Sequence, residues 1–209
     1  MEPVACPTIK RKDLAIFLQK LDPLPSPKDV LEQYPVPAEI AAEVLFRAYG
    51  HRDVWGRRVA DLGCGNGVLA IGVAHLDASR VVALDLDEEA LAVARSNAAR
   101  HGLSITFTHD DVRDFDETVD TVFMNPPFGG QRKHADRPFL EAALRNADVV
   151  YTFHHASTRR FVEREVNRLG ATVRDRRTYK FPLPHLQPYH REHEGEVEVA
   201  HYRIVKGDS

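Results

Sequence analysis

From Arg58 onward, short apolar segments alternate with longer segments whose apolar residues recur at helical spacing. This alternation is typical of parallel strands joined by crossover helices. We therefore expect an α/β fold built on an open, mostly parallel, doubly wound sheet. The expected strands are residues 58–62, 80–85, 104–109, 118–124 and 148–153, and the expected helices are 68–76, 87–102, 137–147 and 157–170.

Two further strands are expected at the end of the chain. Residues 171–181 and 194–205 alternate apolar with polar side chains, which favours an antiparallel pair around the loop 182–195. The preceding helix is expected to begin at a Ser157 cap.

The first part of the chain has a different organisation. Residues 8–21 and 38–49 have helical apolar spacing, and a proline-rich connector separates them. We expect a helical extension over residues 1–50 that contributes to the ligand site, and a single compact domain over residues 51–209.

Composition narrows the functional classes. The chain has 209 residues, 43% of them hydrophobic, and its 28 Lys+Arg against 31 Asp+Glu leave a net charge of −3. A global basic field is absent, so binding to nucleic acid would need a local patch. Cys6 and Cys64 are the only cysteines, too few for a disulfide framework or a cysteine-based zinc site. Because no signal peptide or membrane-spanning run is found either, we expect a soluble, cytoplasmic protein.

A glycine-rich loop, "DLGCGNG", follows the first expected strand. Gly63, Gly65 and Gly67 remove side chains beside a helix N-terminus, where the backbone can approach a ligand. Asp85 ends the next strand, where a carboxylate can bind both hydroxyls of a ribose. The acidic Asp61 suits a cationic ligand better than a pyrophosphate, which favours S-adenosylmethionine over a dinucleotide. The third strand is followed by Asp111 and Val112, which we expect beside the adenine.

A rigid polar corner, "NPPF", follows the fourth expected strand. The side-chain oxygen of Asn125 and the carbonyl of Pro126 can each accept one N–H of a planar amino group, and so align its nitrogen with a methyl group. Pro126 and Pro127 restrict the backbone, and Phe128 can stack on a flat substrate. The corner predicts methylation of an amino group and leaves open a nucleobase or a glutamine amide.

Five segments occur in one order along the chain: "VLEQYPVPAEIA" (30–41), "ADLGCGNGVLAIG" (60–72), "DLDEEAL" (85–91), "MNPPFG" (124–129) and "HHASTR" (154–159). Together they resemble the methyltransferase-like protein five family, which methylates N6 of an adenosine in small-subunit ribosomal RNA. The resemblance covers residues 10–205. It implies a class I methyltransferase fold of the Rossmann-like type, with strand order 3-2-1-4-5-7-6.

The resemblance also implies site residues. The target base is expected at Asn125, Pro126, Pro127 and Phe128. The methyl-donor contacts are expected at Gln33, Tyr34, Asp61, Gly63, Gly65, Asn66, Val68, Asp85, Leu86, Asp111, Val112 and Asn125. Two departures from the family pattern are Val36, in a position that is commonly threonine, and His155, where lysine is more usual.

Partners follow from the same resemblance. It implies a small zinc-ribbon activator protein that pairs along a sheet edge, and the segment 104–109 has no proline or lysine to protect such an edge. Contacts with structured ribosomal RNA are expected at Lys10, Arg11, Lys12, Arg132, Lys133, His154 and His155. No metal site is expected, since His185, His190 and His193 have no cysteine or close ligand pair beside them.

Three alternatives remain at this point. A glutamine N5-methyltransferase of a release factor shares the corner, but commonly has Tyr in place of Phe128 and a separate N-terminal domain. A guanine-N2 methyltransferase usually has a duplicated domain. An RNA-binding scaffold that retains the fold need not bind S-adenosylmethionine at all.

Overall fold

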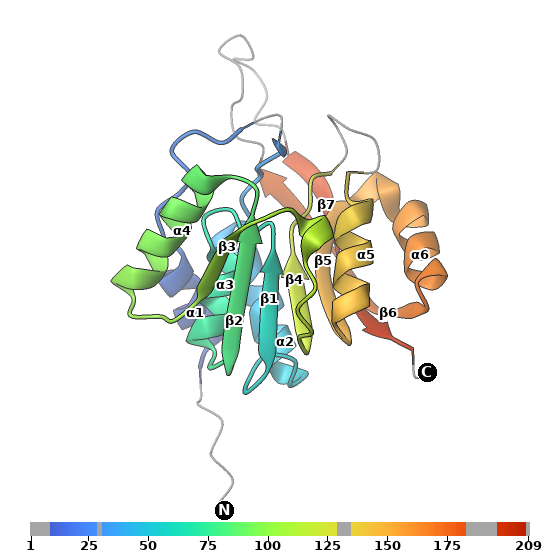
Figure 1. Cartoon of the computed structure of the whole chain (residues 1–209), viewed down its shortest axis with the longest axis horizontal. Helices are drawn as coiled ribbons and strands as arrows, with labels where there is room; N and C mark the ends of the chain where they lie inside the picture. The colour runs from blue at the N-terminus through green and yellow to red at the C-terminus, as the bar shows by residue number, and fades with distance from the viewer. Residues whose placement is uncertain (1–8, 29–30, 129–134, 183–195, 208–209) are drawn as a thin grey trace, which may run out of the picture.

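A computed structural model describes residues 9–28, 31–128, 135–182 and 196–207. Its centre is a seven-stranded sheet in the order β3-β2-β1-β4-β5-β7-β6, as predicted (Figure 1). The five strands from β3 to β5 are parallel, and β7 runs antiparallel to both β5 and β6. The strands are β1 Arg58–Leu62, β2 Arg80–Asp85, β3 Thr106–His109, β4 Thr121–Met124, β5 Val149–His155, β6 Ala171–Pro182 and β7 Glu196–Lys206.

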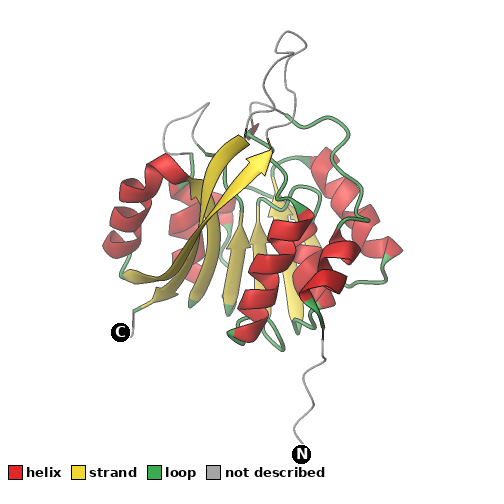
Figure 2. Ribbon diagram, turned by 180° about the vertical axis from the view of Figure 1, so that it is seen from behind, coloured by secondary structure: helices red, strands yellow, loops and turns green. Residues whose placement is uncertain are grey.

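Helices cover both faces of this sheet (Figures 1 and 2). They are α1 Arg11–Leu18, α2 Ala38–Gly50, α3 Val68–His75, α4 Glu88–Arg100, α5 Arg137–Asn146 and α6 Arg159–Arg168, with short 3₁₀ turns η2 Val112–Asp114 and η3 Ala156–Thr158. The consecutive residues Phe123 and Met124 point to opposite faces and belong to separate apolar cores, as the two-residue period of a strand requires. Phe123 packs in the core that α1 to α4 cover, and Met124 in the core beneath α5 and α6.

The helices of residues 1–50 share a core with the sheet. Leu14 and Leu18 of α1 and Leu45 of α2 are buried in the same cluster as Phe123. Helix α3 approaches α2 closely at Gly72, where an added Cβ would lie 2.3 Å from a methyl carbon of Leu45. The expected extension therefore forms one layer of the fold.

Several element bounds differ from the expectation. Strand β3 begins at Thr106 and β4 at Thr121, because only these shorter segments pair with their neighbours. The Ser157 cap is wrong: α6 begins at Arg159, and the side chain that accepts a backbone N–H in this region is that of His155, which caps η3.

The carboxyl ends of the five parallel strands meet at one edge of the sheet, the upper edge in Figure 1. The loops that follow β1, β2, β3 and β4 therefore converge there, which is where open α/β sheets bind ligands. In the described ranges, every helix is too short or too polar to cross a membrane.

Candidate active site

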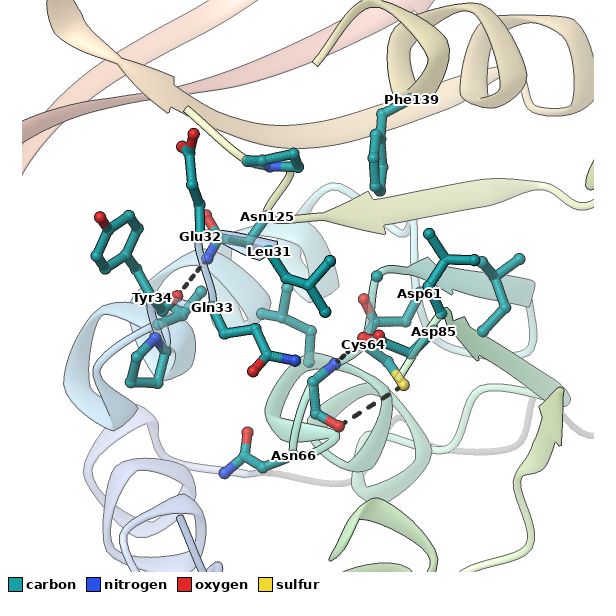
Figure 3. Close-up of a pocket in the computed structure, with 18 of the residues that line it drawn as sticks. Leu31, Glu32, Gln33, Tyr34, Asp61, Cys64, Asn66, Asp85, Asn125 and Phe139 are labelled. Carbon is teal, nitrogen blue, oxygen red and sulfur yellow. Dashed lines mark hydrogen bonds between the residues drawn. The ribbon is translucent and has the colours of Figure 1, made fainter. Parts of the chain in front are cut away.

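A cavity that is partly open to solvent lies at this edge. Its floor comes from the glycine loop and the ends of β2 and β4, and one wall comes from the start of α5 (Figure 3). A segment that we call the strap, residues 22–28 and 31–36, contributes another wall. Of the predicted methyl-donor residues, the cavity is lined by Gln33, Tyr34, Asp61, Gly63, Gly65, Asn66, Val68, Asp85, Leu86, Val112 and Asn125.

The glycine loop has a backbone that only glycine adopts readily. Gly63, Gly65 and Gly67 have φ angles of 74°, 55° and 85°. At Gly63 an added Cβ would also lie 3.0 Å from a ring carbon of Phe139. The positive φ angles of this turn therefore favour glycine at all three positions, and the Phe139 ring of α5 also restricts the space at Gly63.

Asp85 connects the glycine loop to β2. One of its carboxylate oxygens accepts a hydrogen bond from Gly65 N (2.8 Å) and the other from Asp87 N (2.9 Å). Burial raises the pKa of Asp85. Each oxygen retains a lone pair, so the carboxylate can still accept hydroxyl hydrogens from a ribose.

Asp61 has an oxygen without a partner. Its Oδ2 accepts from Ala70 N at 2.9 Å, whereas its buried Oδ1 has no hydrogen-bond partner in the part of the chain that the structure describes. Burial raises the pKa of Asp61 to about 7. A buried, unpartnered acceptor is costly, and a cation in the cavity would satisfy it. The residue therefore fits the ammonium group of S-adenosylmethionine.

Asn125 is oriented by the strap. Its Nδ2 donates a hydrogen bond to the carbonyl oxygen of Tyr34 at 2.7 Å. Its Oδ1 is buried, and no described residue bonds to it. The amide oxygen is therefore available as an acceptor beside the cavity (Figure 3).

The rest of the corner is placed differently from the expectation. Pro127 lines the cavity, while Pro126 is buried behind it. Phe128 does not line the cavity: its ring stacks on that of Tyr34, with centroids 5.8 Å apart and planes 17° apart. The aromatic ring that faces the cavity from the α5 side is that of Phe139.

The strap is bound to the floor by polar contacts. Gln33 donates from Nε2 to Asp87 (2.9 Å) and accepts from Lys28 N (2.7 Å), and the Lys28 ammonium lies 2.7 Å from Asp87. Asn66 donates to the carbonyl of Asp22 at 3.0 Å. Gln33 thus lines the cavity while its amide fixes the strap to the start of α4.

Asp111, His154 and the basic residues at the start of α1 also lie elsewhere than predicted. Asp111 is turned away from the cavity, since its carboxylate caps η2 and pairs with Arg113, and the neighbouring Asp110 lines the cavity in its place. His154 is 1% exposed and bonded to Asp136, so its ring is not available to RNA.

Lys10, Arg11 and Lys12 are exposed, but the chain enters α1 from the edge of the sheet opposite the cavity (Figure 1). His155 is half-buried and bonded to Ser157. Arg132, Lys133, His185, His190 and His193 lie outside the described residues.

Sequence reasoning did not find Glu32, Cys64 or Phe139, all of which line the cavity. Phe139 belongs to a helical apolar pattern that indicates only core packing. Glu32 is buried and has a φ of 49°, uncommon for a residue with a side chain. Its position in the family-like "LEQYP" segment was the available signal.

Comparison with known proteins agrees with this geometry. Residues 38–149 match the family model described as methyltransferase small domain. The uncharacterized protein MJ0284 of Methanocaldococcus jannaschii is 37% identical, and the alignment covers 95% of each chain. The rRNA N(6)-adenosine-methyltransferase METTL5 of Danio rerio is 35% identical over 94% of this chain and 99% of its own.

Among solved structures, the PH1948 protein of Pyrococcus horikoshii superposes with a TM-score of 0.88 and is 42% identical, covering 96% of this chain and 99% of its own. Family model, curated relatives and solved fold thus agree over nearly the whole length. The chain therefore belongs to the methyltransferase small domain family and, within it, to the METTL5 group.

Proposed function

We propose that this enzyme transfers a methyl group from S-adenosylmethionine to N6 of an adenosine in small-subunit ribosomal RNA. The observation that carries the proposal is the buried Oδ1 of Asn125, which has no partner among the described residues and lies beside a cavity whose floor suits a cationic nucleoside. The curated METTL5 relative, similar over almost its full length, supports the choice of ribosomal RNA adenosine over a glutamine amide.

The residues of the chain orient the reactants. Asp85 would bind the ribose of the methyl donor and Asp61 its ammonium, while Gly63 and Gly65 allow its close approach. The bound donor supplies an electrophilic methyl group on a sulfonium.

The N6 amine of adenine is a poor nucleophile because its lone pair is conjugated with the ring. Asn125 Oδ1 would accept one of its N–H groups and align the nitrogen with the methyl group. The nitrogen becomes acidic once methylated, so it can lose its proton to water, and no strong base is needed.

RNA binding would need a local patch on a chain of net charge −3. Arg160 and Arg176 are exposed and form no ion pair with any described residue. In the sheet, Arg176 of β6 pairs with Tyr202, and Tyr202 pairs with Thr152 of β5. Thr152 in turn pairs with Met124, the residue before the corner. Arg176 therefore lies at the same height along the strands as the start of the corner. These arginines, with His155, Arg132 and Lys133, are our proposed phosphate contacts.

A ribosomal RNA substrate is consistent with a cytoplasmic enzyme.

We also propose a zinc-ribbon activator protein that pairs with β3. This strand is an edge of the sheet and its side chains are mostly exposed. Beside it lies a second cavity, lined by apolar residues such as Val82 and Phe115 and by Asp114, Asp116 and Glu117. An added strand at this edge could place an apolar or basic side chain in that cavity.

Mass spectrometry of nucleosides tests the proposed activity. Small-subunit ribosomal RNA from cells that lack the gene should lose one N6-methyladenosine, and the purified enzyme should restore it with a labelled methyl donor. A release factor serves as the competing substrate in the same assay. Label on its glutamine, with none on RNA, would replace the proposal with the glutamine alternative.

A further inference from the structure

Asp136, His154 and Thr152 form a buried chain of hydrogen bonds outside the cavity. His154 Nδ1 lies 2.9 Å from Asp136 Oδ2, and His154 Nε2 lies 2.9 Å from Thr152 Oγ1. The three residues are at most 4% exposed. A neutral imidazole with its proton on Nδ1 satisfies both contacts, because Nδ1–H donates to the carboxylate and Nε2 accepts from the hydroxyl.

These hydrogen bonds lie at the start of α5, which the polypeptide reaches after the corner. The backbone leaves β4 at Asn125 and reaches α5 at Asp136. Thr152 pairs with Met124, so His154 of β5 stands beside the corner. One end of the intervening segment is bonded to Tyr34 through Asn125, and the other end to β5 through His154.

Asp136 precedes α5 but does not cap it. An aspartate in this position commonly accepts a free N–H of the first helical turn, worth about 1 kcal/mol. Here its side chain makes no capping bond and contacts His154 instead. The carboxylate therefore connects the start of α5 to the central sheet.

The start of α5 forms part of the cavity wall. Ala135 and Phe139 both line the cavity, and the Phe139 ring packs against Gly63. Figure 3 shows Phe139 directed into the cavity from α5. A shift of the first turn of α5 would move this ring relative to the glycine loop and to Asn125.

We infer that Asp136 and His154 are positioning residues for methyl transfer, which fix the start of α5 so that Ala135 and Phe139 keep their places on the cavity wall. Neither side chain lines the cavity, so both act through α5. The inference rests on the proposed function only for its RNA substrate, since the contact and its effect on α5 can be measured without RNA.

Four variants test the inference. Asp136→Ala and His154→Leu remove the contact, and His154→Asn retains an N–H near the place of Nδ1. Tyr151→Phe is the matched control, because it deletes a buried hydrogen bond from the same strand to Asp53 (2.5 Å). Should His154→Leu fail to fold, Asp136→Ala, which removes the carboxylate that accepts from Nδ1, carries the test alone.

The kinetic readout is kcat for RNA methylation, measured where circular dichroism shows each variant folded. We expect kcat to fall by about 10- to 100-fold in Asp136→Ala and His154→Leu, because small displacements of a reacting pair are costly. His154→Asn should recover most of the loss, and Tyr151→Phe should keep wild-type kcat with a lower melting temperature.

Hydrogen–deuterium exchange provides the readout without RNA. Peptides over residues 136–144 should exchange faster in Asp136→Ala than in wild type or in Tyr151→Phe. The inference would be overturned if Asp136→Ala kept the kcat and the exchange rates of the wild type. It would also be overturned if Tyr151→Phe lost as much kcat as Asp136→Ala. A wild-type enzyme that methylates no RNA would defeat the proposed function instead, and the exchange data would still decide the role of the contact.

Discussion

The side-chain amide of Asn125 donates a hydrogen bond of 2.7 Å to the main-chain carbonyl of Tyr34, a residue 91 positions earlier in the sequence. This bond decides which end of the amide faces the cavity, because the nitrogen is bonded while the oxygen has no partner in the described ranges of the chain. It also uses the backbone of Tyr34, so the orientation of Asn125 does not depend on the phenol. The strap thereby contributes to the geometry of the reaction as well as to the cavity wall.

Replacing Asn125 should separate methyl transfer from binding of the methyl donor. Asn125→Ala removes the acceptor, and we predict a loss of kcat of about 100-fold or more. Asn125→Asp keeps an oxygen but brings a carboxylate against the Tyr34 carbonyl, so it should be equally inactive. Calorimetry should show affinity for the methyl donor within about threefold of wild type. Full turnover by Asn125→Ala would refute the corner mechanism.

The close approach of Gly63 to Phe139 can be measured by a double-mutant cycle. Gly63→Ala should destabilise the protein by about 1–2 kcal/mol for its positive φ, plus the cost of the 3.0 Å contact with the ring. Gly56→Ala is the control for φ alone, since Gly56 has a φ of 68° and open space around its Cβ position. Combining Gly63→Ala with Phe139→Ala should give less than the summed losses in urea denaturation. Strict additivity would show that the ring imposes no constraint.

The burial of Asp61 predicts that the free energy of unfolding decreases as the pH rises. Its pKa is raised to about 7 by burial, above the ordinary value of 3.8, so the folded state binds the proton more tightly than the unfolded state. The contribution of this group to stability is fully present below pH 4 and is lost as the pH rises to about 7. Urea denaturation of the ligand-free protein should show this slope, and Asp61→Asn should lack it.

The same group predicts how binding of the methyl donor responds to pH. The ammonium of S-adenosylmethionine favours the ionised carboxylate, so affinity should rise between pH 5.5 and 7.5. Binding near pH 6.5 should release a proton, which calorimetry in buffers of different ionisation enthalpy detects. An affinity that is flat over this range in wild type would show that Asp61 does not face the ammonium.

The two edges of the sheet offer a matched test of the proposed activator. Replacing Thr106 and Thr108 of β3 by lysine should abolish co-purification with the zinc-ribbon protein, because charged edge strands oppose strand addition. Replacing Thr172 and Thr178 of β6, the other edge strand, by lysine adds the same two exposed charges and should leave the complex intact. Equal loss in both variants, or in neither, would contradict pairing at β3.

The sequence predicted the parts of this fold that depend on local pattern. Strands β1 and β2 have the expected bounds, because a continuous apolar run followed by Gly or Asp signals a buried parallel strand. The strand order was confirmed, but it came from family resemblance and not from the residues themselves.

The errors concern side-chain direction at strand ends. His154 and His155 are neighbours, and only the pleat of β5 decides that one is buried against Asp136 while the other caps η3. In the same way, Asp110 lines the cavity and Asp111 caps a turn. Phe139 was missed because a helical apolar pattern does not distinguish a core residue from one on a cavity wall.

The strap lies outside the segment that this chain shares with the family model, which begins at residue 38. The glycine loop, Asp85 and the corner all lie within the matched segment, whereas the wall formed by the strap comes from residues that precede it. A transplant of residues 22–36 between family members would therefore exchange the shape of the entrance, provided that the new segment still offers a main-chain carbonyl to the amide of Asn125.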